Sequence, residues 1–364
     1  MTDAGTPAPD VVYRWDLDKT YLQTEFSTVR GLLQAAVEGP HRKRAIPGMR
    51  ALLKALSEAT DARVVVVSGS PTWLRRRILR MFALHTIRCD RLVLKDFGAQ
   101  VRRGRLRAIR NQVGYKLAAH LETRLWLTVR GEAAPEVCFG DDAEVDALVY
   151  CLYGDVCARR VSAPRLARVL EVCGCYADEI ATILGHVSQL ERHDPVRRIF
   201  IHLEGNSPPA RFGAYRGRVV ATFNALQIAL DLAAQGLCDD RAVIPVAEEL
   251  ASQGGFGPEA LAGSMEDAVR RGLCPAPLAQ RLAADVLPHT ALYDAGWSDA
   301  FGGRVAARLA RSAAPVPVRV GTEVLPYERL FANEHAFARA RRLARTAAGR
   351  IPGLADFLAP TDDE

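Results

Sequence analysis

The stretch VVYRWDLDKT, residues 11–20, places an apolar run directly before two aspartates, Asp16 and Asp18. A short run of β-branched and aromatic residues predicts a strand, here over 11–15. Side chains at positions i and i+2 of a strand project the same way, so the two carboxylates share one face at the strand's end. Two carboxylates that close cannot both ionise cheaply, and a divalent cation removes this conflict. The stretch therefore predicts a strand that delivers acidic groups to a site.

Strand and helix patterns alternate from this stretch to about residue 238. Short, continuously apolar strands separated by helices predict an α/β fold with a doubly wound parallel sheet, in which ligands gather at the carboxyl ends of the strands. The expected strands are 11–15, 62–70, 92–94, 136–139, 199–203 and 218–223. The expected helices are 47–59, 72–84, 115–125, 143–153, 163–173, 177–190 and 225–235.

After residue 238 the pattern predicts helices only, an α-helical C-terminal region over 239–364. The candidates are 240–252, 258–273, 276–286, 301–312 and 327–349. We therefore expect three parts: a flexible N-terminus (1–10), an α/β core (11–238) with a helical insertion at about 160–195, and the C-terminal helices.

Composition limits the class of protein. With 364 residues and 49% hydrophobic content, the chain can bury a large core. Its apolar runs are much shorter than the ~20 residues of a membrane helix, and its start does not resemble a signal peptide, so we expect a cytoplasmic protein without a transmembrane segment. The eight cysteines are scattered, which favours thiols over a metal site.

The net charge of +6 comes from arginine, since only five of the 48 basic residues are lysines. Because arginine is spread over the whole chain, no local cluster singles out a nucleic-acid surface, and nucleic acid is the less favoured partner. Solvated helix faces are the favoured interpretation of the arginines, and an electropositive rim that attracts a phosphorylated substrate is the alternative.

Further acidic groups follow the strand at 136–139, where Asp141 and Asp142 come directly after Gly140 and Asp146 lies near. These hard oxygen ligands suit Mg²⁺ better than zinc. A third strand end offers the hydroxyl of Ser68, and a helix start offers Lys116. Carboxylates, a metal and anion donors together fit phosphoryl transfer, in which one carboxylate can act as nucleophile and another as general acid and base.

Four segments in this order resemble the motifs of the haloacid dehalogenase (HAD) superfamily: DLDKT at 16–20, VVVVSGS ending at Ser70, Lys116 within GYKLAAHLE, and GDDAEVD at 140–146. The chain is more closely similar, over about 11–238, to the catalytic domain of the actin-patch phosphatidate phosphatase family and its bacterial relatives. That similarity includes PGM at Pro47, SGSP at 68–71, LKDFG at 94–98, IFIHL at 199–203 and VVATFNALQIALDLAAQGL at 219–237. The chain departs from that family at Lys19, usually acidic, at SGSPTW in place of SNSPW, and at GDDAEVD in place of GDSGQxD.

The resemblance implies a HAD-like Rossmannoid core and a role for each motif residue. Asp16 would be nucleophile and metal ligand. Asp18 would be general acid and base, and its backbone carbonyl would bind the metal. Ser68 would bind a phosphoryl oxygen, and Lys116 would neutralise nucleophile and phosphate. The remaining metal candidates are Asp141 as a direct ligand, Asp146 through water or by orienting Lys116, and Asp142 as a more indirect one.

We therefore expect a Mg²⁺-dependent phosphomonoester hydrolase acting through an aspartyl-phosphate on Asp16. The intervals between motifs leave no room for a large cap domain. An open site predicts a large substrate, such as a lipid headgroup or a phosphorylated macromolecule, unless the C-terminal helices serve as a lid. The alternatives are a polynucleotide-end phosphatase and a non-catalytic scaffold that retains the fold.

Overall fold

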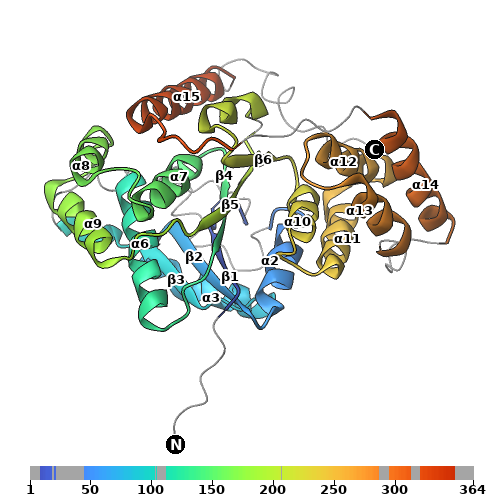
Figure 1. Cartoon of the computed structure of the whole chain (residues 1–364), viewed down its shortest axis with the longest axis horizontal. Coiled ribbons are helices and arrows are strands. Elements are labelled where there is room, and N and C mark those ends of the chain that lie inside the picture. Colours follow the sequence, from blue (N-terminus) through green and yellow to red (C-terminus); the bar gives the residue numbers. More distant parts are fainter. Residues whose placement is uncertain are drawn as a thin grey trace, which may run out of the picture.

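The computed structural model describes residues 9–18, 20–21, 45–102, 104, 112–205, 207–286, 295–312 and 320–348. Within these ranges six strands form one parallel sheet in the order β3-β2-β1-β4-β5-β6 (Figure 1). The strands are β1 (Val11–Trp15), β2 (Ala62–Pro71), β3 (Arg91–Lys95), β4 (Glu136–Asp141), β5 (Val196–His202) and β6 (Val219–Thr222). The predicted α/β fold with a doubly wound parallel sheet is confirmed. Lys19 and most of the expected N-terminal segment 1–10 lie outside the described residues.

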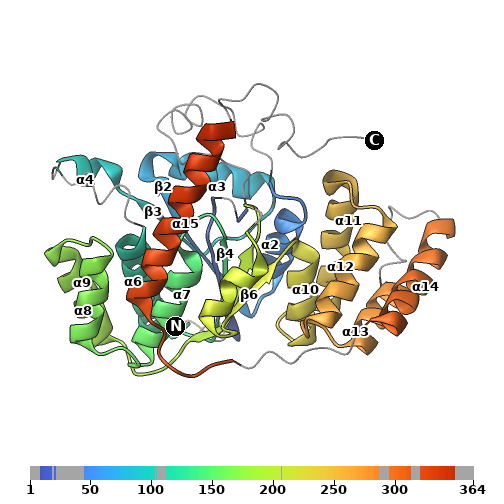
Figure 2. The ribbon, with the colours of Figure 1, turned by 90° about the horizontal axis from the view of Figure 1, so that it is seen from above.

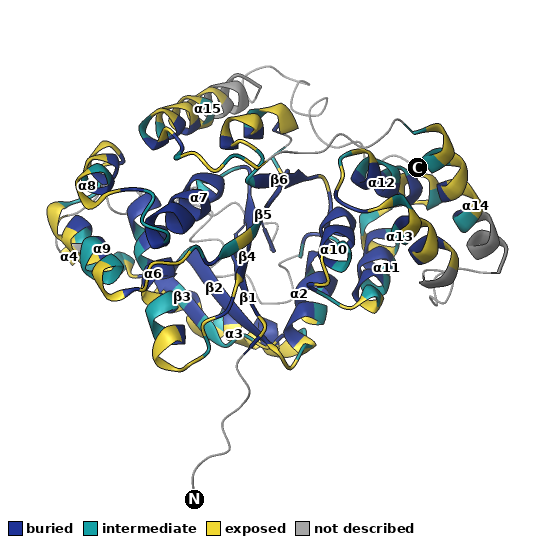
Figure 3. Cartoon of the chain, viewed as in Figure 1, coloured by how far each residue is buried: buried dark blue, intermediate teal, exposed yellow. Residues whose placement is uncertain are grey.

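Helices cover both faces of the sheet, with buried residues facing inward (Figure 3). One face packs against α2 (Met49–Glu58), α3 (Arg75–Leu84) and α10 (Ala225–Ala234). The other packs against α6 (Val113–Val129), α7 (Asp146–Cys157), α8 (Ala163–Val172) and α9 (Ala177–Gln189). The alternation within β1 follows from this arrangement, since Tyr13 and Trp15 enter the first core and Val12 contacts the α6 side.

The C-terminal region is helical, as predicted. Most of it shares the first core with the sheet, whereas Tyr327 and Leu330 belong to the second. Its elements are η4 (Asp240–Ala242), α11 (Val243–Gly254), α12 (Pro258–Arg270), α13 (Ala276–Arg281), η5 (Leu282–Val286), α14 (Ala295–Arg311) and α15 (Tyr327–Ala348). Leu250, Met265 and Phe301 belong to the same buried cluster as β1 and α2. Figures 1 and 2 both place α11–α14 at one side of the sheet, next to α2 and α10.

Gly48 explains how closely α11 approaches the sheet layer. It precedes α2 with φ of 79°, a conformation that favours glycine, and a Cβ there would lie 2.9 Å from the Ala225 Cβ. Glu249 of α11 accepts hydrogen bonds from the Gly48 amide (3.2 Å) and Arg50 Nε (3.0 Å). A carboxylate at the start of α2 is also favoured by the helix dipole.

Several boundaries differ from the expected ones. The helix expected at 47–59 begins at Met49 because Gly48 is left-handed, and the helix expected at 72–84 opens as a 3₁₀ turn, η2 (Thr72–Leu74). The helix expected at 143–153 is Asp146–Cys157. The described chain also contains two short elements, α4 (Phe97–Arg102) and η3 (Pro209–Tyr215). Neither has a strong hydrophobic periodicity in the sequence.

Candidate active site

Polar side chains gather at the carboxyl end of the sheet where β1 lies between β2 and β4. Trp15, the last residue of β1, is in register with Val66 of β2 and Phe139 of β4. Asp16 therefore lies level with Val67 and Gly140, one residue before Ser68 and Asp141 near the ends of those two strands. The strand order reverses at β1, because β2 and β3 lie on one side of it and β4 to β6 on the other. Open α/β sheets bind ligands at such a position.

Lys116 lies among three carboxylates at this edge. Its Nζ is 3.0 Å from Asp16 Oδ1 and 2.7 Å from Glu144 Oε2, and it also donates to Asp146 Oδ1. Lys116, Asp16 and Asp146 are each at most 1% exposed. The residue that the sequence predicts for charge neutralisation therefore contacts the predicted nucleophile directly.

The cluster holds more negative than positive charge. Burial, together with neighbouring carboxylates, raises the pKa of Asp16 and of Asp141 well above its ordinary value, although Lys116 acts in the opposite sense. Burial also raises the pKa of Asp146. Burial alone would lower the pKa of Lys116, but the carboxylates Asp146, Asp16 and Glu144 raise it well above its usual range. The lysine therefore stays charged, and the acids require a further cation to ionise together.

Asp18 and the end of β2 form the second part of the site. Asp18 Oδ2 accepts hydrogen bonds from the hydroxyls of Ser68 (2.9 Å) and Ser70 (2.8 Å). The Ser70 amide donates to Ser68 Oγ at 2.9 Å, and Tyr115 of α6 donates to the Ser68 carbonyl at 2.9 Å. These bonds fix the Asp18 carboxylate beside Ser68, so an acid or base and an anion donor lie next to each other.

The turn after β4 orients Asp141. Its Oδ1 accepts from the amides of Ala143 (2.5 Å) and Glu144 (2.9 Å), and these bonds delay the start of α7 to Asp146. Asp146 Oδ2 accepts from the Asp141 amide at 3.2 Å. Gly140 permits this packing, because a Cβ there would lie 2.5 Å from the Asp146 Cβ.

The structure does not bring Asp142 into the cluster. Its carboxylate accepts from the amides of Gly205 (2.7 Å) and Ser207 (2.9 Å), in the segment after β5. These contacts give Asp142 a role in holding that segment.

The acidic cluster can hold a metal ion. Carboxylate oxygens of Asp16, Glu144 and Asp146 lie within 4.8 Å of one another. Among the described residues, Asp16 Oδ2 and Asp141 Oδ2 are buried without a hydrogen-bond partner. Buried carboxylate oxygens without donors, in a set made only of oxygen ligands, fit a hard divalent cation.

Sequence reasoning missed Glu144, Ser70 and Tyr115. Glu144 lies within the same GDDAEVD segment, just before α7, and the motif resemblance assigns it no role. Ser70 is two residues beyond Ser68, so the period of a strand is the signal that could have paired their hydroxyls on Asp18. The Tyr115 bond links two elements distant in sequence and leaves no local signal.

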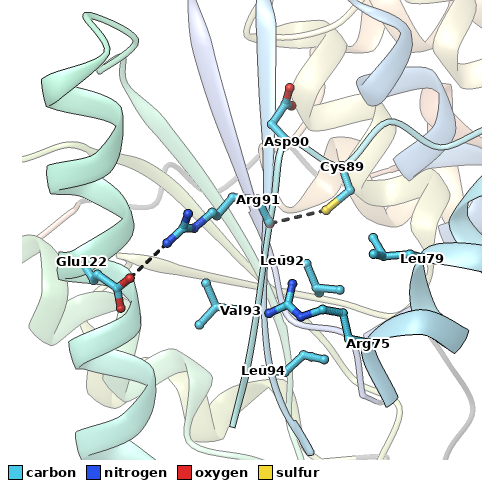
Figure 4. A pocket seen from close by; sticks show the side chains of 9 residues that line it. All are labelled: Arg75, Leu79, Cys89, Asp90, Arg91, Leu92, Val93, Leu94 and Glu122. Atoms are coloured by element: carbon cyan, nitrogen blue, oxygen red, sulfur yellow. Dashed lines mark hydrogen bonds and ion pairs between the residues drawn. The ribbon is translucent and has the colours of Figure 1, made fainter. Parts of the chain in front are cut away.

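A pocket of about 450 Å³ lies elsewhere, along the edge strand β3 (Figure 4). Arg75 and Leu79 of α3, Glu122 of α6 and residues 89–94 line it. None of these residues belongs to the Asp16 cluster, so this pocket is distinct from the candidate active site.

Comparison with known proteins gives one match. Residues 15–163 match the family described as "Phosphatidate phosphatase APP1, catalytic domain". No curated protein and no solved structure matches the chain significantly. Within the described residues, no helix has the length and apolar character needed to span a membrane. The match begins at Trp15, the last residue of β1, ends just after α7, and includes every residue of the Asp16 cluster and the end of β2. It confirms the resemblance expected from the motifs: residues 15–163 are similar to the catalytic domain of a phosphatidate phosphatase.

Proposed function

We propose that this protein is a Mg²⁺-dependent phosphomonoester hydrolase of the HAD type, with Asp16 as its nucleophile. The observation that carries the proposal is the 3.0 Å contact between Lys116 Nζ and Asp16 Oδ1 inside a buried acidic cluster. The family match supports phosphatase chemistry independently.

In the first half of the reaction, an oxygen of Asp16 attacks the phosphorus and the bond to the leaving oxygen breaks. Lys116 keeps Asp16 ionised and offsets the charge of the entering phosphoryl group. The Asp18 carboxyl, held by Ser68 and Ser70, gives its proton to the leaving oxygen. The alcohol departs, and the phosphoryl group remains on Asp16.

In the second half, Asp18 accepts a proton from water, whose oxygen attacks the phosphoryl group and releases inorganic phosphate and the free Asp16 carboxylate. The Ser68 hydroxyl is placed to turn from Asp18 toward a phosphoryl oxygen. Mg²⁺, when bound, would supply positive charge to the transferring group. Its expected ligands are Asp16, the Asp18 backbone carbonyl and Asp141, with Glu144 and Asp146 nearby.

We further propose a lipid phosphate as the substrate, supported by the description of the matched family, and a location in the cytoplasm.

The test of the chemistry is hydrolysis of p-nitrophenyl phosphate with and without Mg²⁺. Asp16→Asn should abolish turnover, whereas Asp10→Asn, at the opposite end of β1, should leave it unchanged. Rapid quenching should give a burst of nitrophenol and a single added phosphoryl group on the peptide that contains Asp16. Wild-type protein that hydrolyses no member of a broad phosphoester panel would refute the proposal and favour the non-catalytic scaffold.

A further inference from the structure

The segment formed by η2 and α3, residues 72–84, exposes apolar and basic side chains together. Of the seven large hydrophobic residues exposed in the described chain, three lie here: Trp73 (55% exposed), Leu79 (43%) and Leu84 (60%). Arg75, Arg76 and Arg80 are exposed between them. The buried side of the helix, with Ile78 and Phe82, packs into the core, so these residues occupy the outward face.

Within the described residues, no carboxylate compensates the charge of Arg75, Arg76 and Arg80 on this face. The sequence TWLRRRILRMFAL contains no acidic residue, and no carboxylate in the described part of the chain pairs with Arg75, Arg76 or Arg80. In contrast, arginines elsewhere on the surface, such as Arg304 and Arg308, contact Glu259. Three arginines without acids attract an anionic partner.

This face adjoins the candidate active site. Ser70, whose hydroxyl binds Asp18, is three residues before Trp73, and β2 ends at Pro71 immediately before η2. Arg75 and Leu79 also line the pocket beside β3 (Figure 4). The Trp73 end of this face therefore lies next to the strand end that carries Ser70, at the rim of the site.

The mixture of side chains favours one class of partner. An indole and two leucines among arginines match the interface of an anionic bilayer, where aromatic and aliphatic groups enter the headgroup region and basic groups contact lipid phosphates. Nucleic acid would use the arginines and the indole, but it offers no apolar layer for Leu79 and Leu84.

We propose that the exposed face of residues 72–84 docks the protein on an anionic lipid bilayer and presents phosphorylated headgroups to the Asp16 site. The biological purpose of this surface rests on the proposed function, whereas the binding itself can be measured without turnover.

The test uses full-length protein and vesicles of phosphatidylcholine with phosphatidylserine, which carries no phosphomonoester, so binding is separated from catalysis. Wild-type protein should sediment with these vesicles and not with pure phosphatidylcholine. Arg80→Gln with Leu84→Ser should weaken binding about tenfold or more, because one arginine near an anionic surface contributes roughly fivefold and the leucine adds its apolar area.

The helix α8 provides a matched control. Arg168 and Val172 are also exposed and four residues apart, so Arg168→Gln with Val172→Ser should leave binding unchanged. Hydrolysis of soluble p-nitrophenyl phosphate should be the same for both double variants and the wild type. Hydrolysis of phosphatidate in vesicles should fall only for the α3 variant.

Three results would overturn the proposal. The first is wild-type protein that fails to bind anionic vesicles, or an α3 variant that binds like the α8 variant. The second is wild-type protein that binds oligonucleotides but not vesicles, with oligonucleotide binding lost in the α3 variant. This result would assign the face to nucleic acid. The third is a dimer dissociated by the α3 variant, which would assign it to a second copy. Loss of all phosphatase activity with intact vesicle binding would refute the proposed function and leave this inference standing.

Discussion

Replacing Asp16, the proposed nucleophile, should stabilise the metal-free protein. Asp16 is 1% exposed and lies near Asp141, Glu144 and Asp146, and burial with like charge raises its pKa. An acid with a raised folded-state pKa destabilises the fold at any pH where it must ionise, and each tenfold weakening of its acidity on folding costs about 1.4 kcal/mol. Asp16→Asn removes this penalty and leaves Lys116 paired with two carboxylates.

We expect the free energy of unfolding of Asp16→Asn, in EDTA at pH 7.5, to exceed that of the wild type by about 1–3 kcal/mol. For a chain of this length the corresponding rise in Tm is about 1–4 °C. Mg²⁺ should raise the Tm of the wild type more than that of the variant, so the difference between them should shrink or reverse. Calorimetry with and without Mg²⁺ measures both quantities.

Asp155 provides the control, because it is equally buried but fully paired. It accepts from Arg160 Nε (2.5 Å), Arg218 Nη1 (2.7 Å) and the Tyr327 hydroxyl (2.5 Å). Asp155→Asn should therefore lower the free energy of unfolding by about 3–5 kcal/mol. If Asp16→Asn lowers the Tm in EDTA to a similar extent, Asp16 is a structural partner of Lys116, and the account of an electrostatically strained acidic cluster is wrong.

Four further predictions concern the same site. The free energy of unfolding of the metal-free protein should fall as pH rises above about 4, since the cluster acids have raised pKa values, and saturating Mg²⁺ should flatten this slope in pH-dependent calorimetry. Glu144→Gln should raise the Mg²⁺ concentration for half-maximal activity about tenfold or more. Asp142→Asn should leave that concentration unchanged and lower the free energy of unfolding, measured by chemical denaturation, by about 1–3 kcal/mol. Ser68→Ala should lower kcat/KM about 100-fold, whereas Ser70→Ala should mainly shift the pH profile of kcat, because it removes one of the two hydrogen bonds to Asp18 Oδ2. Equal effects of the two substitutions in both assays would contradict separate roles for the two serines. Gly140→Ala should displace Asp146 and lower kcat about 100-fold with little change in substrate KM, as measured by steady-state kinetics.

Much of the fold was predictable because its signals are local. Residues 64–67 are four consecutive valines, and β1 ends at a pair of charges, so both strands and the parallel sheet follow from pattern alone. The boundaries that failed depend on contacts distant in sequence. Gly48 is left-handed where α2 meets α10 and α11, and the delayed start of α7 depends on the Asp141 side chain binding two amides.

The site was predictable to the level of its motif residues and no further. The motifs indicated that Asp16 and Lys116 would meet, and they lie 3.0 Å apart. The pattern did not distinguish Asp142 from Glu144, since both are acidic residues beside Asp141. The Glu144 carboxylate contacts Lys116, whereas the Asp142 carboxylate binds backbone amides of the segment after β5. The assignment of a role to each of these residues stays a prediction.

The single hydrophobic core that joins the sheet to α11–α14 also limits how this protein can diversify. Leu250, Met265 and Phe301 pack in the same buried cluster as the strand layer. A protein in which the sequence after residue 238 is replaced by another would therefore have uncovered apolar surface on α2 and α10. Exchange of α11–α14 for an unrelated sequence should therefore destabilise the sheet layer as well. The sheet layer and α11–α14 therefore act as one folding unit, and a change of substrate preference that keeps the protein stable is expected from substitutions around the Asp16 site.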